Sequence, residues 1–298
     1  MISICVPIYN FDVTNLLVEL NLQSKRLDVP SEIILIDDCS NPYFKSLNDK
    51  ECSKHTYIKL KNNLGRAVIR NKFLEFTKYE YLLFLDCDSF IPRLDFLEIY
   101  VKSIKLSNVS VICGGRIYPK EKPARNKILR WKYGVYKESK PYDVRSKYPN
   151  RSFMTNNFVV SKNVFEIVQF DERIYAYGHE DTLFGFQLKK AGIMVSHIYN
   201  PVLNGDLENN LDYILSVEKS ILNLVNILKF INYDKEFIDD VKLLRFYYKY
   251  YKYKDVFAFL FDVLKPVMRY AFSKGYVNLT LFDFYKLGFL SININVKD

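Results

Sequence analysis

Two carboxylates separated by a single residue, Asp86 and Asp88, directly follow a run of five apolar or aromatic residues, Tyr81–Leu85. A continuous apolar run that ends in polar residues is typical of a strand buried on both faces, as in a parallel sheet covered by helices. Ligands of open α/β sheets bind beyond the carboxyl ends of the strands, and alternation along the chain points both carboxylates to the same side. Because like charges at that separation repel, a divalent cation carrying a phosphate would stabilise them. A pair of solvated loop acids is the alternative, and the preceding apolar run argues against it.

A second pair of acids, Asp37 and Asp38, follows another apolar run at 32–36. Neighbouring strand ends in one sheet lie within about 5–10 Å of each other. One acid set can accept hydrogen bonds from a base or ribose while the other carries a metal, which suits a nucleoside diphosphate. The chain has no G-x-G-x-x-G after its first expected strand and no G-x-x-x-x-G-K-[ST] segment, which argues against a Rossmann dehydrogenase and a P-loop NTPase. We therefore expect the phosphates to be held by metal and not by a glycine loop.

Strands and helices alternate along the first 115 residues, which predicts βαβ units and a mostly parallel sheet. Strands are expected at 2–8, 32–36, 57–60, 81–85 and 109–113, and helices are expected after Asp12 or Thr14, at 66–78 and at 94–104. These elements would bring the two acid pairs to one edge of the sheet.

The later part of the chain is less regular. Segment 116–151 has no clean period and is interpreted as a long insertion or a partly helical loop over one face. Strands are expected at 153–160 and 193–199, and helices at 163–168 and 182–191. Beyond Gly205 the pattern is helical throughout, with a break expected near Pro266. We expect a domain boundary near residue 206, which gives an N-terminal domain over 1–205 and a C-terminal helical region over 206–298.

Composition places the 298-residue chain among ordinary globular proteins, with 49% hydrophobic and 26% charged residues. Its five cysteines show no C-x-x-C spacing, which favours reduced thiols in a cytosolic protein over a disulfide framework or a zinc site. The first strand begins at residue 2, which leaves no room for a signal peptide, and no run of about 18 uncharged apolar residues predicts a membrane-spanning helix.

The net charge of +9 is unevenly distributed. Segment 116–151 alone carries +9 and segment 242–274 carries +6, which indicates anionic partners at particular faces. No RNA- or DNA-binding motif accompanies the basic residues, so no nucleic-acid partner is expected. Segment 116–151 could hold an anionic acceptor or a diphosphate. The Tyr- and Lys-rich helices of the second basic segment, 242–274, could lie on an anionic bilayer, where a lipid-linked acceptor would be. A packed helical tail with solvated lysines is the alternative.

Five short segments carry a resemblance to a known family. They are Val6–Asn10, Ile36–Ser40, Asn63–Arg66 with Arg70 and Asn71, Leu85–Asp88, and Gly178–Asp181. Their order and spacing over residues 2–205 resemble those of family 2 glycosyltransferases of GT-A fold, which transfer a sugar from a nucleotide diphosphate with inversion. The resemblance implies a Rossmann-like, mostly parallel central sheet flanked by helices, followed here by a C-terminal helical region.

The resemblance also implies roles at the donor site. Pro7 and Tyr9 would flank the nucleobase, and Asp38 would accept a hydrogen bond from its edge. Arg70 would hold the base side of the pocket. Asp86 would meet the ribose or the diphosphate, with Cys87 beside it as a further nucleotide-sugar contact. Asp88 would bind Mn²⁺ or Mg²⁺ bridging the diphosphate.

On the acceptor side, the resemblance implies that Asp181 is the general base that deprotonates the acceptor hydroxyl. Its position at a predicted helix start would favour the ionised carboxylate. Glu180 and His179 would lie beside it, and Asn156 and Asn157 would line the sugar site.

Each of these residues has a structural alternative. Asp181 could simply cap a helix, and Arg70 could solvate a helix face. Asn156 and Asn157 could be hydrogen-bonded polar groups of a strand. His197 lies within an expected strand, where a core or edge histidine is favoured over a ligand.

One position departs from the family pattern. Many relatives have a metal-binding histidine some twenty residues after the Glu-Asp pair, where this chain has Asn204 after Asn200–Leu203. An amide oxygen is a weaker ligand, although it suits hard cations. We therefore expect an altered metal affinity.

Together these observations predict an inverting glycosyltransferase that uses a nucleotide diphosphate sugar, with UDP-sugar favoured. A glycan or lipid-linked acceptor in bacterial surface-polysaccharide assembly is expected from the family alone. Two alternatives remain. One is a haloacid-dehalogenase-type phosphatase that uses the strand ending in Asp86 and Asp88, although a second motif with the required Asp is missing after Gly205. The other is a degenerate GT-A protein that only binds.

Overall fold

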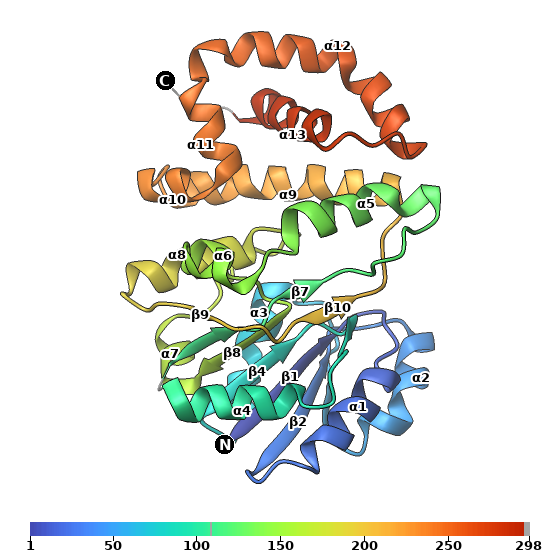
Figure 1. The fold of residues 1–298 in the computed structure, drawn as a ribbon, viewed down its shortest axis with the longest axis vertical. Helices are drawn as coiled ribbons and strands as arrows, with labels where there is room; N and C mark the ends of the chain where they lie inside the picture. The colour runs from blue at the N-terminus through green and yellow to red at the C-terminus, as the bar shows by residue number, and fades with distance from the viewer. Residues whose placement is uncertain (108, 295–298) are drawn as a thin grey trace.

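The computed structural model describes residues 1–107 and 109–294, and these form an α/β fold followed by a layer of helices (Figure 1). The described residues include a seven-stranded sheet in the order β3-β2-β1-β4-β8-β6-β9. Its strands are β1 (Ile2–Ile8), β2 (Ser31–Asp37), β3 (Thr56–Lys59), β4 (Tyr81–Leu85), β6 (Val111–Cys113), β8 (Asn157–Ser161) and β9 (Ser196–His197). Only β8 runs antiparallel to its neighbours in this sheet, so the predicted GT-A-like, mostly parallel sheet is confirmed.

Both faces of the sheet are covered, as the continuous apolar runs predict. Alternate residues of β4 enter two different hydrophobic clusters: Leu83 and Leu85 pack with α1 and α4, whereas Leu82 and Phe84 pack with α3, α7 and α8. The helices concerned are α1 (Thr14–Ser24), α3 (Arg66–Lys72), α4 (Phe96–Ser107), α7 (Lys162–Ile167) and α8 (Glu180–Lys190). Helix α2 (Pro42–Cys52) was not predicted, although it begins with an Asn41 cap and a proline in its first turn.

A second, three-stranded sheet in the order β5-β10-β7 was also not predicted. It joins β5 (Ser89–Phe90), β10 (Val202–Asn204) and β7 (Arg116–Ile117). Strand β10 places Asn204 opposite Ser89 and Val202 opposite Arg116. This small sheet therefore gathers three separate segments of the chain next to the end of β4.

The basic segment 116–151 is partly helical, as predicted. It contains α5 (Ile128–Tyr133), a π-helical turn (Gly134–Glu138), α6 (Tyr142–Ser146) and 3-10 turns at Arg125–Lys127 and Asn150–Ser152. Much of its charge is internal. Arg130 and Arg116 both pair with Glu138, and Arg145 is buried. The segment is therefore a structural layer as well as a basic surface.

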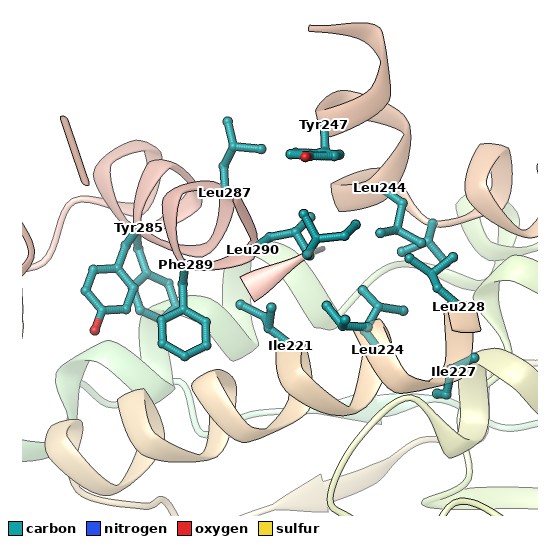
Figure 2. Close-up of a cluster of buried hydrophobic side chains, with 14 of the residues drawn as sticks. Ile221, Leu224, Ile227, Leu228, Leu244, Tyr247, Tyr285, Leu287, Phe289 and Leu290 are labelled. Carbon is teal, nitrogen blue, oxygen red and sulfur yellow. The ribbon is translucent and has the colours of Figure 1, made fainter. Parts of the chain in front are cut away.

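The C-terminal helices are α9 (Asn210–Phe230), α10 (Lys235–Asp240), α11 (Lys242–Lys249), α12 (Lys254–Ser273) and α13 (Leu279–Asn293). Figure 2 shows Ile221, Leu224 and Leu228 of α9 packed against Leu244 of α11 and Leu290 of α13. Among the described residues, no helix is long and apolar enough to cross a membrane.

The break expected near Pro266 is wrong, because α12 continues through it. Proline removes one hydrogen bond, here to the carbonyl four residues earlier, at Asp262. Both residues lie on the exposed side of the helix, where water can bond to the released carbonyl. The exposed position therefore avoids a buried carbonyl without a hydrogen-bond partner, and α12 continues through the proline.

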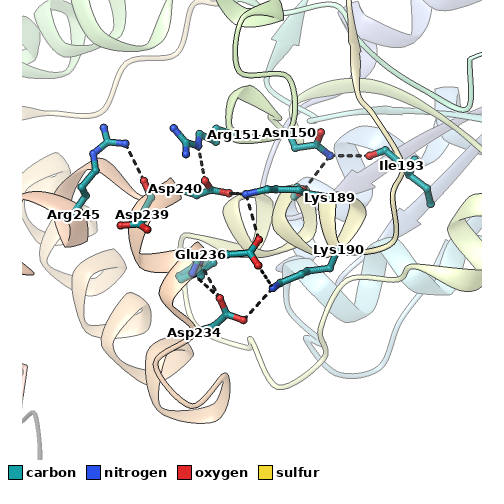
Figure 3. A network of polar contacts seen from close by, with 12 residues as sticks. Asn150, Arg151, Lys189, Lys190, Ile193, Asp234, Glu236, Asp239, Asp240 and Arg245 are labelled. Atoms are coloured by element: carbon teal, nitrogen blue, oxygen red, sulfur yellow. Dashed lines mark hydrogen bonds and ion pairs between the residues drawn. The ribbon is translucent and has the colours of Figure 1, made fainter.

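Polar contacts join α8 to the C-terminal helices (Figure 3). Lys189 lies 2.9 Å from Asp240, which also pairs with Arg151 at 2.5 Å. Lys190 lies 2.8 Å from Glu236. Leu183 and Phe186 of α8 belong to the same hydrophobic cluster as α9. The boundary at residue 206 stays a prediction, and α8 packs across it.

Candidate active site

Asp38, at the end of β2, organises the loop that follows β3. Its two carboxylate oxygens accept hydrogen bonds from the backbone N–H of Leu64 at 2.7 Å and of Gly65 at 3.0 Å. Gly65 has φ of +81°, a conformation that favours glycine. Burial raises the pKa of Asp38, while these two bonds oppose the rise. Each carboxylate oxygen of Asp38 therefore has a second lone pair, which could accept the predicted hydrogen bond from a nucleobase.

The end of β1 offers an aromatic surface beside this loop. Pro7 is half-buried, and the ring of Tyr9 is exposed. The next residue, Asn10, is fixed by its backbone N–H donating to Ser40 Oγ at 2.8 Å. An exposed ring on a fixed strand end is suited to stacking a planar base.

Arg70 links two of the predicted site residues. Its side chain is 2% exposed, and Nη2 donates to Asp86 Oδ1 at 2.8 Å, while Nη1 lies 3.8 Å from Glu180 Oε1. The alternative in which Arg70 only solvates a helix face is therefore wrong. Burial acts to raise the pKa of Asp86, but Arg70 and the more distant Arg66 outweigh it, so the pKa is lowered. Asp86 is thus a fixed anion, tied to α3.

Asp88 faces Asn204 across the small sheet. Asn204 Nδ2 donates to Asp88 Oδ2 at 3.4 Å, and the amide oxygen of Asn204 is buried without a hydrogen-bond partner among the described residues. Burial, followed by the charge of Asp86, raises the pKa of Asp88. Burial disfavours the ionised form of Asp88, and a divalent cation bound to Asp88 and to the amide oxygen of Asn204 would stabilise it. Such a cation needs few protein ligands when a diphosphate and water supply the others.

No group of three or more His, Cys, Asp or Glu side chains within the described residues is arranged to hold a metal by itself. The oxygen atoms of Asp88 and Asn204 fit Mn²⁺ or Mg²⁺ whose remaining ligands come from a bound diphosphate. A cleft of about 420 Å³ adjoins it and is lined by Cys87, Asp88 and residues of α1. Burial and the neighbouring Asp88 raise the pKa of Cys87 to about 12, so its thiol stays neutral.

Arg116 is a site residue that sequence reasoning missed. It lies in β7, donates to Glu138 Oε2 at 3.2 Å, and is close enough to lower the pKa of Asp86, Asp88 and Asp181. The guanidinium of Arg116 therefore pairs directly with Glu138, and its charge also acts on the carboxylates that follow β4 and begin α8. The sequence held a signal, because Arg116 follows an expected strand and a Gly-Gly pair and so reaches the same sheet edge as the acids.

Asp181 lies in the first turn of α8. Its Oδ1 accepts hydrogen bonds from the backbone N–H of Thr182 at 2.6 Å and from Thr182 Oγ1 at 3.2 Å. Burial and the charge of Glu180 raise the pKa of Asp181 to about 6. The helix cap is His179, not Asp181, so the capping alternative is wrong.

The two neighbours of Asp181 have different environments. Glu180 is buried and lies 3.7 Å from Arg66 and 3.8 Å from Arg70, so it belongs to the arginine network and not to an open acceptor surface. His179 has φ of +65°, and its Nδ1 lies 3.2 Å from Thr182 Oγ1. Burial lowers the pKa of His179 to about 4, so its imidazole is neutral.

Helix α9 holds the loop that precedes α8. Asn223 Nδ2 donates to the carbonyl oxygen of Gly178 and lies 3.4 Å from that of Ala176. Gly178 has φ of +95°, and a Cβ there would lie 2.5 Å from Ser220 Cβ. The C-terminal helices therefore set the backbone that presents Asp181.

The two predicted asparagines differ. Asn157 accepts a hydrogen bond from Tyr100 Oη at 2.6 Å and donates to the carbonyl oxygens of Asn200 and Gly115, so its side chain holds strands together. Asn156 is 3% exposed, and neither amide atom has a partner among the described residues. Of the two, Asn156 is thus the side chain with free polar atoms at the end of β4.

His197 is a core histidine, as favoured. Arg145 Nη1 lies 2.6 Å from its Nδ1, and its Nε2 lies 2.8 Å from the carbonyl oxygen of Pro149. Because arginine only donates, Nδ1 accepts and Nε2 carries the proton. Burial lowers the pKa of His197 to about 4.

Comparisons with known proteins identify the family and the fold. The family model for glycosyl transferase family 2 matches residues 3–167, which is more than half of the chain. The fold is similar to that of mannosyltransferase PcManGT from Pyrobaculum calidifontis, solved with GDP-Man and Mn²⁺, at 16% identity over 100% of this chain and 88% of that chain, with a TM-score of 0.61. It is also similar to S. aureus TarS 1-349, at 17% identity over 96% of this chain and 89% of that chain, with a TM-score of 0.52. No curated protein matches the chain. The chain belongs to glycosyl transferase family 2 and has the GT-A fold.

Proposed function

We propose that this glycosyltransferase moves a sugar, with inversion, from a nucleotide diphosphate sugar to a hydroxyl of a glycan or lipid-linked acceptor. A hexose or N-acetylhexosamine, carried by UDP, is the donor sugar that we favour, and surface-polysaccharide assembly in a bacterial cytoplasm is the setting. Family membership supports the transfer reaction and excludes the haloacid-dehalogenase-type alternative.

The observation that carries the proposal is the contrast between Asp181 and its neighbours Asp86 and Glu180. The pKa of Asp88 is also raised, but Asp88 lies beside Asn204 at the expected cation site. Asp86 and Glu180 lie beside arginine side chains, whereas Asp181 has no ion pair among the described residues and has a pKa raised to about 6. A carboxylate with such a pKa is largely ionised at neutral pH and still basic enough to take a proton from a hydroxyl as it attacks. Asp181 is therefore the group best suited to be the general base.

The donor side of the reaction needs positive charge for the departing diphosphate. The charge of Arg116 acts on Asp86, Asp88 and Asp181, and its guanidinium would donate to phosphate oxygens. Asp88 and Asn204 would hold Mn²⁺ or Mg²⁺, which supplies further charge to the leaving group. Asn156, whose two buried amide atoms have no partner among the described residues, would bond to sugar hydroxyls.

The choice of nucleotide can be tested by thermal shift. PcManGT was solved with GDP-Man and TarS with UDP-GlcNAc, so UDP and GDP are the two diphosphates to compare, each with and without Mn²⁺. We expect UDP with Mn²⁺ to raise Tm and UDP alone to raise it less. A response to GDP only would contradict the UDP assignment, and no response to either would contradict a working donor site.

The assignment of the base can be tested separately. Asp181→Asn should reduce transfer about 10²-fold or more while UDP still raises Tm, because the amide cannot accept the proton. Asp28→Asn, at an exposed surface carboxylate, is the matched control and should leave transfer unchanged. Undiminished transfer by Asp181→Asn would refute the assignment. Absence of transfer by the unaltered protein with all sugar donors, despite UDP binding, would instead favour the degenerate binding protein.

A further inference from the structure

The outer face of α12 carries a continuous apolar stripe. Its members recur every three or four residues, twice as adjacent pairs, and are all 41% to 68% exposed: Val256, Phe259, Leu260, Val263, Leu264, Val267 and Tyr270. Residues at this spacing lie on one side of a helix. We call this surface the α12 stripe.

The α12 stripe is separate from the core. The opposite side of the helix buries Phe261, Met268 and Phe272 against the other C-terminal helices. Figure 1 shows α12 as the outermost helix of the C-terminal layer, farthest from the sheet. A helix that is apolar on both sides is normally covered on both sides, so the stripe lacks a partner that its composition requires.

The charge around the α12 stripe indicates what covers it. Segment 242–274, which includes α11 as well as α12, carries eight Lys or Arg against two acids. Of these, Lys265 and Arg269 lie on the packed side of α12, over Phe261 and beside Glu218. Exposed Lys252 precedes the stripe, and Lys274 follows it. Arg125 adds a further cation near the C-terminal end, where its guanidinium lies 4.3 Å from the ring centre of Tyr276. Two copies of this chain would bring like charges together, whereas an anionic surface would attract them.

We propose that the α12 stripe docks the protein on an anionic lipid bilayer, with the helix lying in the plane of the interface. Apolar side chains on one face would enter the acyl boundary, while lysines at the ends of the stripe would meet anionic headgroups. Half-exposed Tyr253 and exposed Tyr276 suit the same depth, because tyrosine has an apolar ring and a polar end. The inference goes beyond the transfer reaction and does not depend on it.

The experiment is flotation of the full chain with vesicles of phosphatidylcholine alone or with about 30% phosphatidylglycerol, each at low and high salt. The test variant is Phe259→Gln/Val263→Gln/Val267→Gln. The matched control replaces three apolar residues that are at least as exposed and lie elsewhere in the chain, Leu94→Gln/Leu106→Gln/Ile167→Gln. Far-UV circular dichroism and the Tm response to UDP with Mn²⁺ show whether each variant keeps its fold and its donor site.

We expect the unaltered protein to float with anionic vesicles and to be partly released by salt. The test variant should bind about tenfold more weakly, and the control within about twofold of the unaltered protein. Absence of flotation, or equal flotation of the test variant, would overturn the proposal. A dimer in vesicle-free solution that the test variant dissociates, measured by sedimentation equilibrium, would assign the stripe to a second copy instead.

Discussion

The ionisation of Asp181 should set the acidic side of the pH–rate profile. Transfer requires the ionised carboxylate, and burial with Glu180 raises its pKa to about 6. The active form is thus present above that pH and is lost below it. A group with this pKa is about nine-tenths ionised at pH 7 and one-tenth ionised at pH 5, so kcat/KM should fall about tenfold between those values.

Two substitutions next to Asp181 should move this limb in opposite directions. Thr182→Val removes a hydroxyl that bonds to the ionised form at 3.2 Å, so the limb should move to higher pH. Glu180→Gln removes a neighbouring negative charge, so the limb should move to lower pH. A hydrogen bond to a charged group contributes about 1.5–3 kcal/mol, and one pKa unit equals 1.36 kcal/mol, so the shift for Thr182→Val should be about one to two units. The shift for Glu180→Gln comes from a lost charge and should have the opposite sign.

The assay is the initial rate of UDP release with acceptor and saturating Mn²⁺, measured from about pH 5 to pH 9. Thr182→Ser keeps the hydroxyl and is the matched control, whose limb should stay with the unaltered protein. The position of the limb is the readout, because a purely structural loss would lower the rate at every pH. A profile without an acidic limb, or shifts of both variants in the same direction, would refute the reasoning.

Three further substitutions test separate parts of the molecule. Asn223→Ala removes the donor that holds the loop before α8, so kcat should fall about tenfold while UDP affinity by calorimetry stays the same. Asn204→Asp adds a carboxylate at the expected cation site, and the Mn²⁺ concentration for half-maximal rate should fall about tenfold; an unchanged value would speak against the site. Gly288→Ala would place a Cβ 2.4 Å from Phe261 Cβ, so urea unfolding should show a loss of about 2 kcal/mol, whereas Gly205→Ala, with open space around it, should show none.

The strands that could be predicted best from the sequence are those formed by a continuous run of apolar residues. Tyr81–Leu85 is apolar throughout because both faces of β4 are covered, and its bounds were predicted correctly. Strands β5 and β7 have two residues each, too few for any period, and they exist because β10 lies between them. Such strands depend on pairing between distant segments, which a local pattern does not contain.

The same limit applies to the site. The motifs located Asp86 and Asp88, which follow β4, and Asp181, which lies in the first turn of α8. Strand alternation predicts that Asn156 and Asn157 point to opposite sides, but not that Tyr100 and Asn200 occupy one of those sides. In the sequence, Arg116 is only one of the twelve Lys and Arg residues of segment 116–151. Its position near the carboxylates depends on the pairing of β7 with β10, which the sequence does not show.

Helix α8 is attached at both ends to the helices that follow residue 206. Asn223 fixes the loop before it, and Asp240 and Glu236 pair with Lys189 and Lys190 at its far end (Figure 3). A chimera that received its C-terminal helices from a relative would keep the strand-borne carboxylates but lose both attachments of the helix that carries Asp181. A chimera joined before α8 would instead keep Asp181 together with the helices that hold α8 in place.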